Sequence, residues 1–186
     1  MPPLIDALRR EHETIAALLD VLDRQVAILE AAGEPDYEAL AALVEYFSDY
    51  PAQVHHPKED LIWGALMARD AAGAAPIGDL EAEHRHLAEL TRGFAAAIDA
   101  VLHDVEVPRV AAARMIRRFV AAERQHIAEE EDIFFPAALR ALRADDWAAL
   151  AAVADKRTDP LADAADRRFA ALRRTIAETA SRPAAC

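Results

Sequence analysis

The sequence predicts an all-α protein, and two observations support this fold class. The 186-residue chain has only five glycines, whereas the good helix formers Ala, Leu, Glu and Arg recur throughout it. Apolar residues repeat at spacings of three and four over long stretches, as in amphipathic helices, and no alternating β-rich run stands out. A chain of this length suits one domain with its own hydrophobic core. Four long helices joined by short loops predict an antiparallel up-down-up-down four-helix bundle.

The apolar stripes give the approximate helix positions, which are 4–32, 36–69, 79–103 and 109–142. Gly33 is expected to cap the first helix, Pro51 and Pro57 to interrupt the second, and Pro108 to start the fourth. The Gly- and Pro-containing segment 71–78 is expected to form a loop. Residues 1–143 are therefore predicted to form the bundle domain.

Residues 144–186 are predicted to form a helical extension. Asp145 and Asp146 resemble the cap of a short helix that begins near Trp147, and Pro160 opens an Arg- and Ala-rich helix that reaches about Ala180. This tail carries no chemistry of its own. We expect it to pack on the bundle or on a partner subunit, as in a homodimer.

Charge and cysteine content exclude several kinds of partner. The net charge of −12 argues against a nucleic-acid or anionic-membrane surface, because both require clustered Lys and Arg. No stretch without Asp, Glu, Lys or Arg exceeds eight residues, so no transmembrane helix is expected. The N-terminus does not resemble a secretory signal, and Cys186 is the single cysteine. We therefore expect a cytoplasmic protein.

An internal repeat is the strongest signal in the sequence. Residues 8–15 match residues 80–87 in their apolar positions and in a Glu-His pair, and residues 55–63 match residues 126–134. The separations agree, since 43 residues separate His12 from His55 and 42 separate His84 from His126. Two helical hairpins related by an approximate two-fold axis would therefore present the same side chains twice, around a paired central site.

The repeated polar residues are candidate metal ligands. A pair four residues apart on a helix shares one face, and one histidine comes from each bundle helix. The predicted ligands are His12, His55, Glu59, His84, His126 and Glu130. This nitrogen and oxygen set suits iron, manganese or zinc. A single histidine on an apolar stripe is more often a core residue, but four at matching positions favour a metal site. His86 and His103 lie off the stripes and are not expected to bind metal.

One ligand assignment stays open on the second helix. His56 and Asp60 have the same spacing as His55 and Glu59, one residue further on. We prefer His55 and Glu59 because their register matches His126 and Glu130 in the repeat. Pro57 is expected to kink this helix at the site.

Taken together, these motifs resemble the hemerythrin-like, or HHE cation-binding, family. The matching stretches are 10–13, 55–60, 83–85 and 126–136, and the resemblance covers roughly residues 1–143. It implies a non-haem di-iron centre in which Glu59 and Glu130 bridge the two irons. It also implies that His12 and His55 bind one iron while His84 and His126 bind the other.

The chain departs from the oxygen-carrying members of that family at one position. Those proteins have a second histidine four residues after the third-helix ligand, where this chain has Ala88. Four histidines resemble members that sense iron, react with nitric oxide or peroxide, or repair iron-sulfur clusters. The expected ligand is therefore a diatomic molecule, peroxide or iron itself, and binding or sensing and catalysis both remain open. Glu131 also stays an alternative to Glu130, because the oxygen carriers use an acid at that spacing.

A ferritin-like di-iron protein is the second alternative. Glu81 with His84 and Glu123 with His126 both form the Glu-x-x-His motif of that class. This assignment leaves His12 and His55 without a role, so it ranks behind the first. Glu81 or Glu123 could still serve as an extra ligand or as an acceptor for a ligand histidine.

Overall fold

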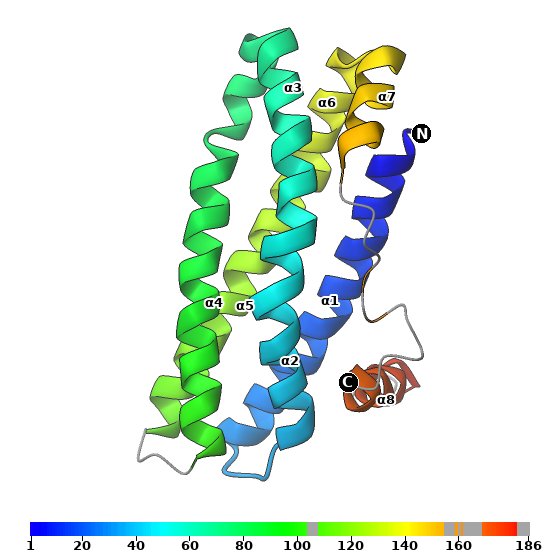
Figure 1. Cartoon of the computed structure of the whole chain (residues 1–186). Coiled ribbons are helices and arrows are strands. Elements are labelled where there is room, and N and C mark those ends of the chain that lie inside the picture. The colour runs from blue at the N-terminus through cyan, green and yellow to red at the C-terminus, as the bar shows by residue number, and fades with distance from the viewer. Residues whose placement is uncertain (104–107, 155–158, 160, 162–168, 182–186) are drawn as a thin grey trace.

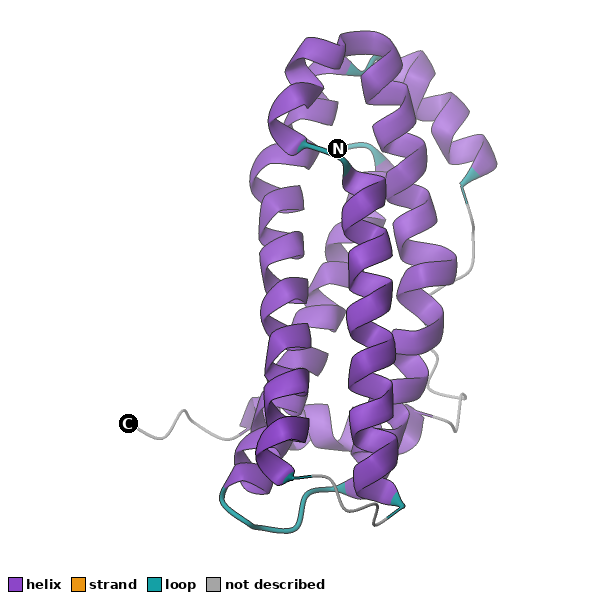
Figure 2. Ribbon diagram, turned by 90° about the vertical axis from the view of Figure 1, so that its left-hand side faces the viewer, coloured by secondary structure: helices purple, strands orange, loops and turns teal. Residues whose placement is uncertain are grey.

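The computed structural model describes residues 1–103, 108–154, 159, 161 and 169–181, and these residues form helices joined by short loops, with no strand among them (Figure 2). Pro160 and Cys186 lie outside the described residues. The bundle contains α1 (Pro3–Glu30), α2 (Tyr37–Tyr50), η1 (Pro51–His55), α3 (His56–Ala74), η2 (Ala75–Ile77), α4 (Leu80–Leu102), α5 (Arg109–Glu129), η3 (Glu130–Phe134) and α6 (Phe135–Ala141). The tail contributes α7 (Ala144–Val153) and α8 (Ala170–Ser181). The all-α prediction is confirmed.

Four helical rods stand side by side, and the chain reverses direction at each connection between them (Figure 1). The first rod is α1 and the third is α4, whereas the second joins α2, η1 and α3 and the fourth joins α5, η3 and α6. Segment 71–78 was expected to be a loop, but α3 continues to Ala74 across a break at Asp70, where φ is −150° and ψ is 72°. Asp36 and Asp79 cap α2 and α4 by accepting hydrogen bonds from backbone N–H groups three residues on.

The described part of the tail packs on its own bundle. Helix α7 contacts α1 and α3, and α8 lies across α1 and α2 (Figure 1). The Tyr46 hydroxyl donates a buried hydrogen bond of 3.0 Å to Asp159 Oδ2, and the Phe169 ring lies 6.0 Å from the Tyr46 ring. These contacts tie the tail to α2.

The first helix ends differently from the prediction. Ala32, and not Gly33, adopts the left-handed conformation, with a φ of 57°. The N–H groups of Ala32 and Gly33 donate to the carbonyls of Leu29 and Ile28 at 3.2 and 2.9 Å. This is the Schellman pattern of a helix end. Gly33 is needed for space, because a Cβ atom there would lie 2.9 Å from Ile28 Cγ2.

Two prolines in the long rods are accommodated by π-helical turns. Pro57 and Pro136 each lie two residues beyond a π-helical segment, after η1 and η3 respectively. A proline inside a helix lacks an N–H donor and its ring crowds the preceding turn, and the extra residue of a π turn provides the room. The extra residue also shifts the helical phase. Ile133 is 40% exposed, whereas Phe134 and Phe135 are fully buried.

The core is divided into two apolar clusters. One is built around Leu19, Phe47, Phe94 and Phe119, and the other joins the ends of the rods near Leu8, Ile62 and Phe134. The residues between them in each rod are the repeated polar residues, so a polar layer crosses the bundle. No helix in the described ranges is both long and apolar enough to cross a membrane.

Candidate metal centre

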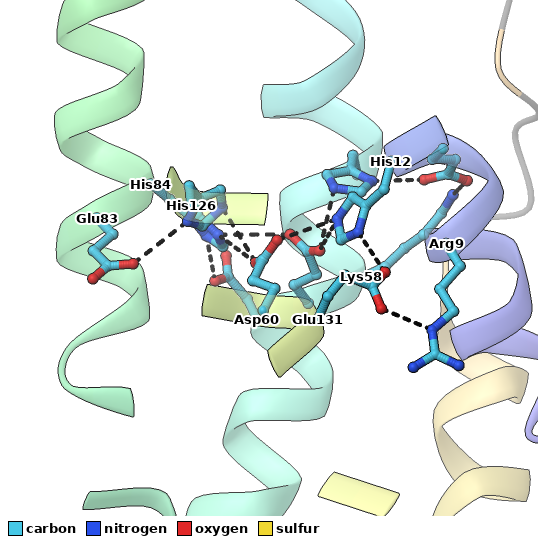
Figure 3. A network of polar contacts seen from close by, with 12 residues as sticks. Arg9, His12, Lys58, Asp60, Glu83, His84, His126 and Glu131 are labelled. Carbon is cyan, nitrogen blue, oxygen red and sulfur yellow. Dashed lines mark hydrogen bonds and ion pairs between the residues drawn. The ribbon is translucent and has the colours of Figure 1, made fainter. Parts of the chain in front are cut away.

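All six predicted ligands meet in the polar layer between the two apolar clusters. The buried polar side chains there include His12 of α1, His55 of η1, Glu59 of α3, His84 of α4, His126 of α5 and Glu130 of η3. None of the six is more than 8% exposed. Every rod thus contributes to one buried cluster, which Figure 3 shows from close by.

The cluster contains two groups of side chains that could each hold a cation. The first consists of His12, His55, Glu59 and Glu130, and the second of His56, Glu59, His84 and His126. In each group the candidate ligand atoms all lie within 4.8 Å of one another. Because Glu59 belongs to both groups, its two oxygens are suited to bridge two cations.

The second carboxylate also lies between the groups. Glu130 Oε2 is 3.2 Å from His12 Nε2, and Glu130 Oε1 is 3.2 Å from His126 Nε2. Glu59 Oε1 lies 3.4 Å from His12 Nε2 and 3.2 Å from His55 Nε2. Both carboxylates therefore face imidazole nitrogens from two different rods.

The inner atoms of the cluster are close to each other but do not form hydrogen bonds. Both oxygens of Glu59, both oxygens of Glu130, and Nε2 of His12, His84 and His126 are buried without a hydrogen-bond partner. Buried polar groups in proteins are almost always hydrogen-bonded, so seven such atoms in one place require an explanation. Lone pairs that converge on common points fit metal cations, and imidazole with carboxylate suits iron, manganese or zinc.

An outer ring of carboxylates faces the other nitrogen of each predicted histidine ligand. His12 Nδ1 lies 2.9 Å from Glu131, His55 Nδ1 2.8 Å from Glu11, and His84 Nδ1 2.9 Å from Asp60. His126 Nδ1 lies 3.4 Å from Glu83 without forming a hydrogen bond. A carboxylate that accepts the Nδ1 proton fixes the tautomer and leaves the Nε2 lone pair directed inward, the usual arrangement around metal-bound histidine.

The outer ring follows the internal repeat. Glu11 and Glu83 occupy equivalent positions before His12 and His84, and each reaches the histidine of the other rod in its hairpin. Asp60 and Glu131 are likewise equivalent, directly after Glu59 and Glu130. They reach across to the opposite hairpin instead. Helical periodicity did not predict this ring, although the Glu-His pair in the repeat is a signal for part of it.

His56 faces the centre as well as His55, and the two belong to different groups of candidate ligands. Its ring stacks on His84 at 4.2 Å and meets His126 edge-on at 5.7 Å. The π turn η1 has more residues than an α turn, so adjacent side chains diverge less and both histidines point inward. Asp60, the expected partner of His56, binds His84 Nδ1 instead. Five buried histidines therefore surround the centre.

Without a cation, protons balance the buried carboxylates. Burial alone would lower the pKa of His12, but Glu130 and Glu59 raise it to about 11. Burial would also lower the pKa of His55, but Glu59 and Glu11 raise it to about 9. At His126, Glu130 and Glu83 likewise outweigh burial and raise the pKa to about 9. Burial would raise the pKa of Glu59, yet the histidines hold it well below its ordinary value. Metal binding must therefore displace protons from the imidazoles.

The remaining candidates lie outside the inner cluster. The side chains of His86 and His103 are 55% and 68% exposed, as expected. Glu81 is 61% exposed and faces Arg85, so the ferritin-like ligand set is not assembled on α4. Glu131 belongs to the outer ring.

Glu123 is buried in the polar layer on α5, where burial raises its pKa to about 7. It is not part of either group of candidate ligands.

The comparisons with known proteins agree with this geometry at the level of the family. The family model described as the hemerythrin HHE cation binding domain matches residues 4–138. This range contains both candidate groups and the whole outer ring. The comparisons with curated proteins and with solved structures gave no significant match.

Proposed function

The chain belongs to the hemerythrin HHE cation-binding family, and from this premise we propose that it is a non-haem di-iron protein that binds a small oxygen or nitrogen compound. The observation that carries the proposal is the set of buried atoms without hydrogen-bond partners on Glu59, Glu130 and three histidines. These atoms converge in two overlapping groups. Two cations that share the carboxylates would provide partners for the atoms of both groups.

In this proposal His12 and His55 hold one iron, and His84 and His126 hold the other, with His56 as a further ligand of the second. Glu59 and Glu130 are the shared carboxylates. Iron would supply an open coordination position and access to two oxidation states, which the side chains themselves lack. Manganese and zinc fit the same donors and are the alternatives that metal analysis separates.

The surrounding side chains orient the ligands and keep water out. Glu131 and Glu11 accept from Nδ1 of His12 and His55, while Arg9 and Lys58 hold these two carboxylates at 2.9 and 2.7 Å. The apolar clusters above and below the polar layer limit water entry. Electrostatic interactions between the side chains and a bound cation are stronger in such a dry, pre-oriented site than in water.

The fifth histidine bears on the kind of activity. Ala88 removes the histidine that oxygen carriers have on the third helix, but His56 brings an imidazole to the same group from the second rod. The histidine count is therefore no argument against reversible ligand binding. We propose binding or sensing of oxygen, nitric oxide or peroxide as the function, with catalysis on the same ligands as the alternative.

Metal analysis tests the proposal directly. The protein is purified without chelating resins, reconstituted anaerobically with ferrous iron, and assayed for iron per chain. Optical spectra are then recorded under oxygen, peroxide and nitric oxide. We expect about two irons per chain and ligand-dependent spectra. A protein that takes up no iron under these conditions would disprove the proposal.

A further inference from the structure

The internal repeat places equivalent sets of four side chains in the two halves of the centre, and the sets differ at one position. The half with His55 has Glu11, His55, Lys58 and Glu59. The half with His126 has Glu83, His126, Glu129 and Glu130 at the equivalent positions. A lysine in one half therefore corresponds to a glutamate in the other. The two residues also differ in exposure, since Lys58 is buried and Glu129 is partly exposed.

The half with His55 is closed to an approaching cation. Lys58 Nζ lies 2.7 Å from Glu11 Oε1, and neither side chain is more than 8% exposed. The other outer carboxylate of this half, Glu131, lies 2.9 Å from Nε of Arg9. A cation that approached these carboxylates would meet two positive charges that already neutralise them.

Two cavities adjoin the half with His126, between α4 and the fourth rod, which lie side by side (Figure 1). Their volumes are about 380 and 170 Å³, and Glu83 and Glu129 line both of them. The larger cavity is also lined by His126 and the smaller by Glu130, and none of their lining residues is Lys or Arg. The two partly exposed carboxylates therefore connect the surface with buried side chains of the inner cluster.

Buried atoms without hydrogen-bond partners lie at the inner side of these cavities. They are Nδ1 of His126 and both carboxylate oxygens of Glu130, on side chains that are 5% and 1% exposed. Glu83 approaches His126 Nδ1 to 3.4 Å from the outside, as Figure 3 shows. A cation held by Glu83 and Glu129 would thus find unsatisfied carboxylate oxygens directly beyond them, and such oxygens are ligands that divalent cations accept.

The volume of the larger cavity suits a hydrated cation. Six water molecules occupy roughly 180 Å³, at about 30 Å³ each, so a divalent ion with its hydration shell fits into 380 Å³. A hollow lined by charges of one sign concentrates ions of the opposite sign. Glu83 and Glu129 give this hollow its negative charge.

A third cavity, of about 200 Å³, lies between α2 and α4 and reaches His56 and Glu123. The exposed Arg92 also lines it. A guanidinium group at this position repels a cation, so the acidic route between α4 and the fourth rod is the more favourable one.

We propose that Glu83 and Glu129 form an entry site for a hydrated divalent metal cation, which they capture between α4 and the fourth rod and pass to the inner cluster beside His126 and Glu130. Lys58 and Arg9 close the equivalent route in the other half. This inference rests on the proposed metal-binding function. It concerns the rate at which metal reaches the centre and not the amount bound at equilibrium.

The repeat supplies a variant that converts one half into the likeness of the other. Glu129→Lys introduces the lysine that the other half has at the equivalent position, and Glu129→Gln removes the charge while it keeps the shape of the side chain. Glu89→Lys is the control, because it changes the net charge as much as Glu129→Lys does. Glu89 is 68% exposed on α4 and lines neither cavity.

Uptake of cobalt(II) by the metal-free protein is followed by stopped-flow absorbance at low ionic strength, and bound cobalt is measured at equilibrium after gel filtration. We expect Glu129→Lys to slow association by about tenfold or more and Glu129→Gln by about threefold, because an acidic hollow raises the on-rate of a cation. Glu89→Lys should stay within about twofold of the unaltered protein. The amount of cobalt bound at equilibrium should be equal in all four proteins. Should Glu129→Lys bind less, Glu129→Gln carries the same expectation at its smaller factor.

Ionic strength provides a second, independent readout. Because Glu83 and Glu129 are partly exposed, dissolved salt screens their attraction for the cation. The association rate of the unaltered protein should fall steeply with added sodium chloride, whereas that of Glu129→Lys should change little. Equal association rates in Glu129→Lys and the unaltered protein, or equal slowing by Glu89→Lys, would overturn the inference. An unaltered protein that binds neither cobalt nor iron at equilibrium would instead disprove the proposed function, so the two failures are distinguishable.

Discussion

The carboxylate of Glu11 lies 2.8 Å from Nδ1 of His55, on the neighbouring rod. Its neighbour in the chain, His12, instead points Nε2 toward Glu59 and Glu130 in the inner cluster. One Glu-His pair therefore serves both layers of the centre, and the pair Glu83 and His84 repeats this arrangement. The outer layer is therefore as much a part of the repeat as the inner cluster.

We predict that Glu11→Gln weakens iron binding by about 10- to 100-fold, the usual effect of removing a carboxylate that holds a metal-bound histidine. The amide cannot carry the negative charge that faces His55 and Lys58, so both would lose a charged partner in the buried layer. Iron affinity is measured by competition with a chelator. Glu13→Gln is the control, because Glu13 is exposed on the same helix. Equal affinities of the two variants would show that Glu11 does not orient His55.

Removal of individual histidines should separate ligands from bystanders. We predict that His84→Ala and His126→Ala each lower the iron content, because these imidazoles face the carboxylates. His86→Ala and His103→Ala should leave it unchanged, since both side chains are exposed. The iron content is determined by elemental analysis after gel filtration. Loss of iron from His86→Ala would mean that α4 is rotated relative to this structure.

His56 is the residue on which the sequence and the structure differ most. We predict that His56→Ala changes the optical spectrum of the iron-loaded protein and lowers its iron content, because the imidazole lies in the second group of candidate ligands. His56→Gln, which preserves some bulk, should show the same spectral change if the nitrogen is a ligand. Spectra identical to those of the unaltered protein would show that His56 only packs against His84.

The sequence predicted the helices and the residues that meet in the inner cluster because both depend on periodicity. Stripes of apolar residues set the rods, and a repeated His-x-x-x-Glu spacing places both groups on one helical face. Periodicity could not predict the shifts in helical phase at the π turns. Pro57 predicted an interruption, but not that a π turn would turn both His55 and His56 inward. In the same way, Ile133 in the π turn η3 is exposed while Phe134 beside it is buried.

Contacts between rods could be predicted only in part. The approach of Glu131 to His12 joins residues 119 positions apart in the chain, and no periodic signal encodes it. The left-handed Ala32 was also missed, because glycine is the usual residue at that position and Gly33 lies next to it.

The stability of the metal-free protein should fall as pH rises, whereas the stabilisation by bound metal should increase. In the metal-free protein the pKa values of His55 and His126 are raised from 6.5 to about 9. A raised folded-state pKa stabilises the fold fully below the unfolded value, and this contribution is lost as pH rises through the folded value. The metal-free protein should therefore lose stability between about pH 6.5 and pH 9. The lowered pKa of Glu59 acts at the acid end, where stability falls as pH falls through its folded value.

In the proposed centre, iron would replace the protons on the imidazoles and would bind more tightly as these protons leave. The difference in melting temperature between iron-loaded and metal-free protein should accordingly grow from about pH 6 to about pH 8. Helix content should persist without metal, because the two apolar clusters do not depend on it. Anaerobic calorimetry measures the melting temperatures, and circular dichroism measures the helix content. A constant difference across this range would contradict proton displacement, and identical melts at every pH would contradict a buried metal site.

The end of α1 gives a prediction that is independent of metal. Ala32 has a φ of 57°, a conformation that costs an L-residue roughly 1 kcal/mol and costs glycine little. Its methyl group is exposed, so replacing it removes little packing. We predict that Ala32→Gly raises the free energy of unfolding by up to about 1 kcal/mol, which corresponds to roughly 2–4 °C in melting temperature for a chain of this size. Gly33→Ala should do the opposite, because its new Cβ would lie 2.9 Å from Ile28 Cγ2 and 3.1 Å from the Ile28 carbonyl oxygen. Urea denaturation of both variants at equal metal loading measures the effect. A destabilised Ala32→Gly protein would contradict a left-handed Ala32 in solution, and an unaffected Gly33→Ala protein would contradict the close approach of Ile28 to that position.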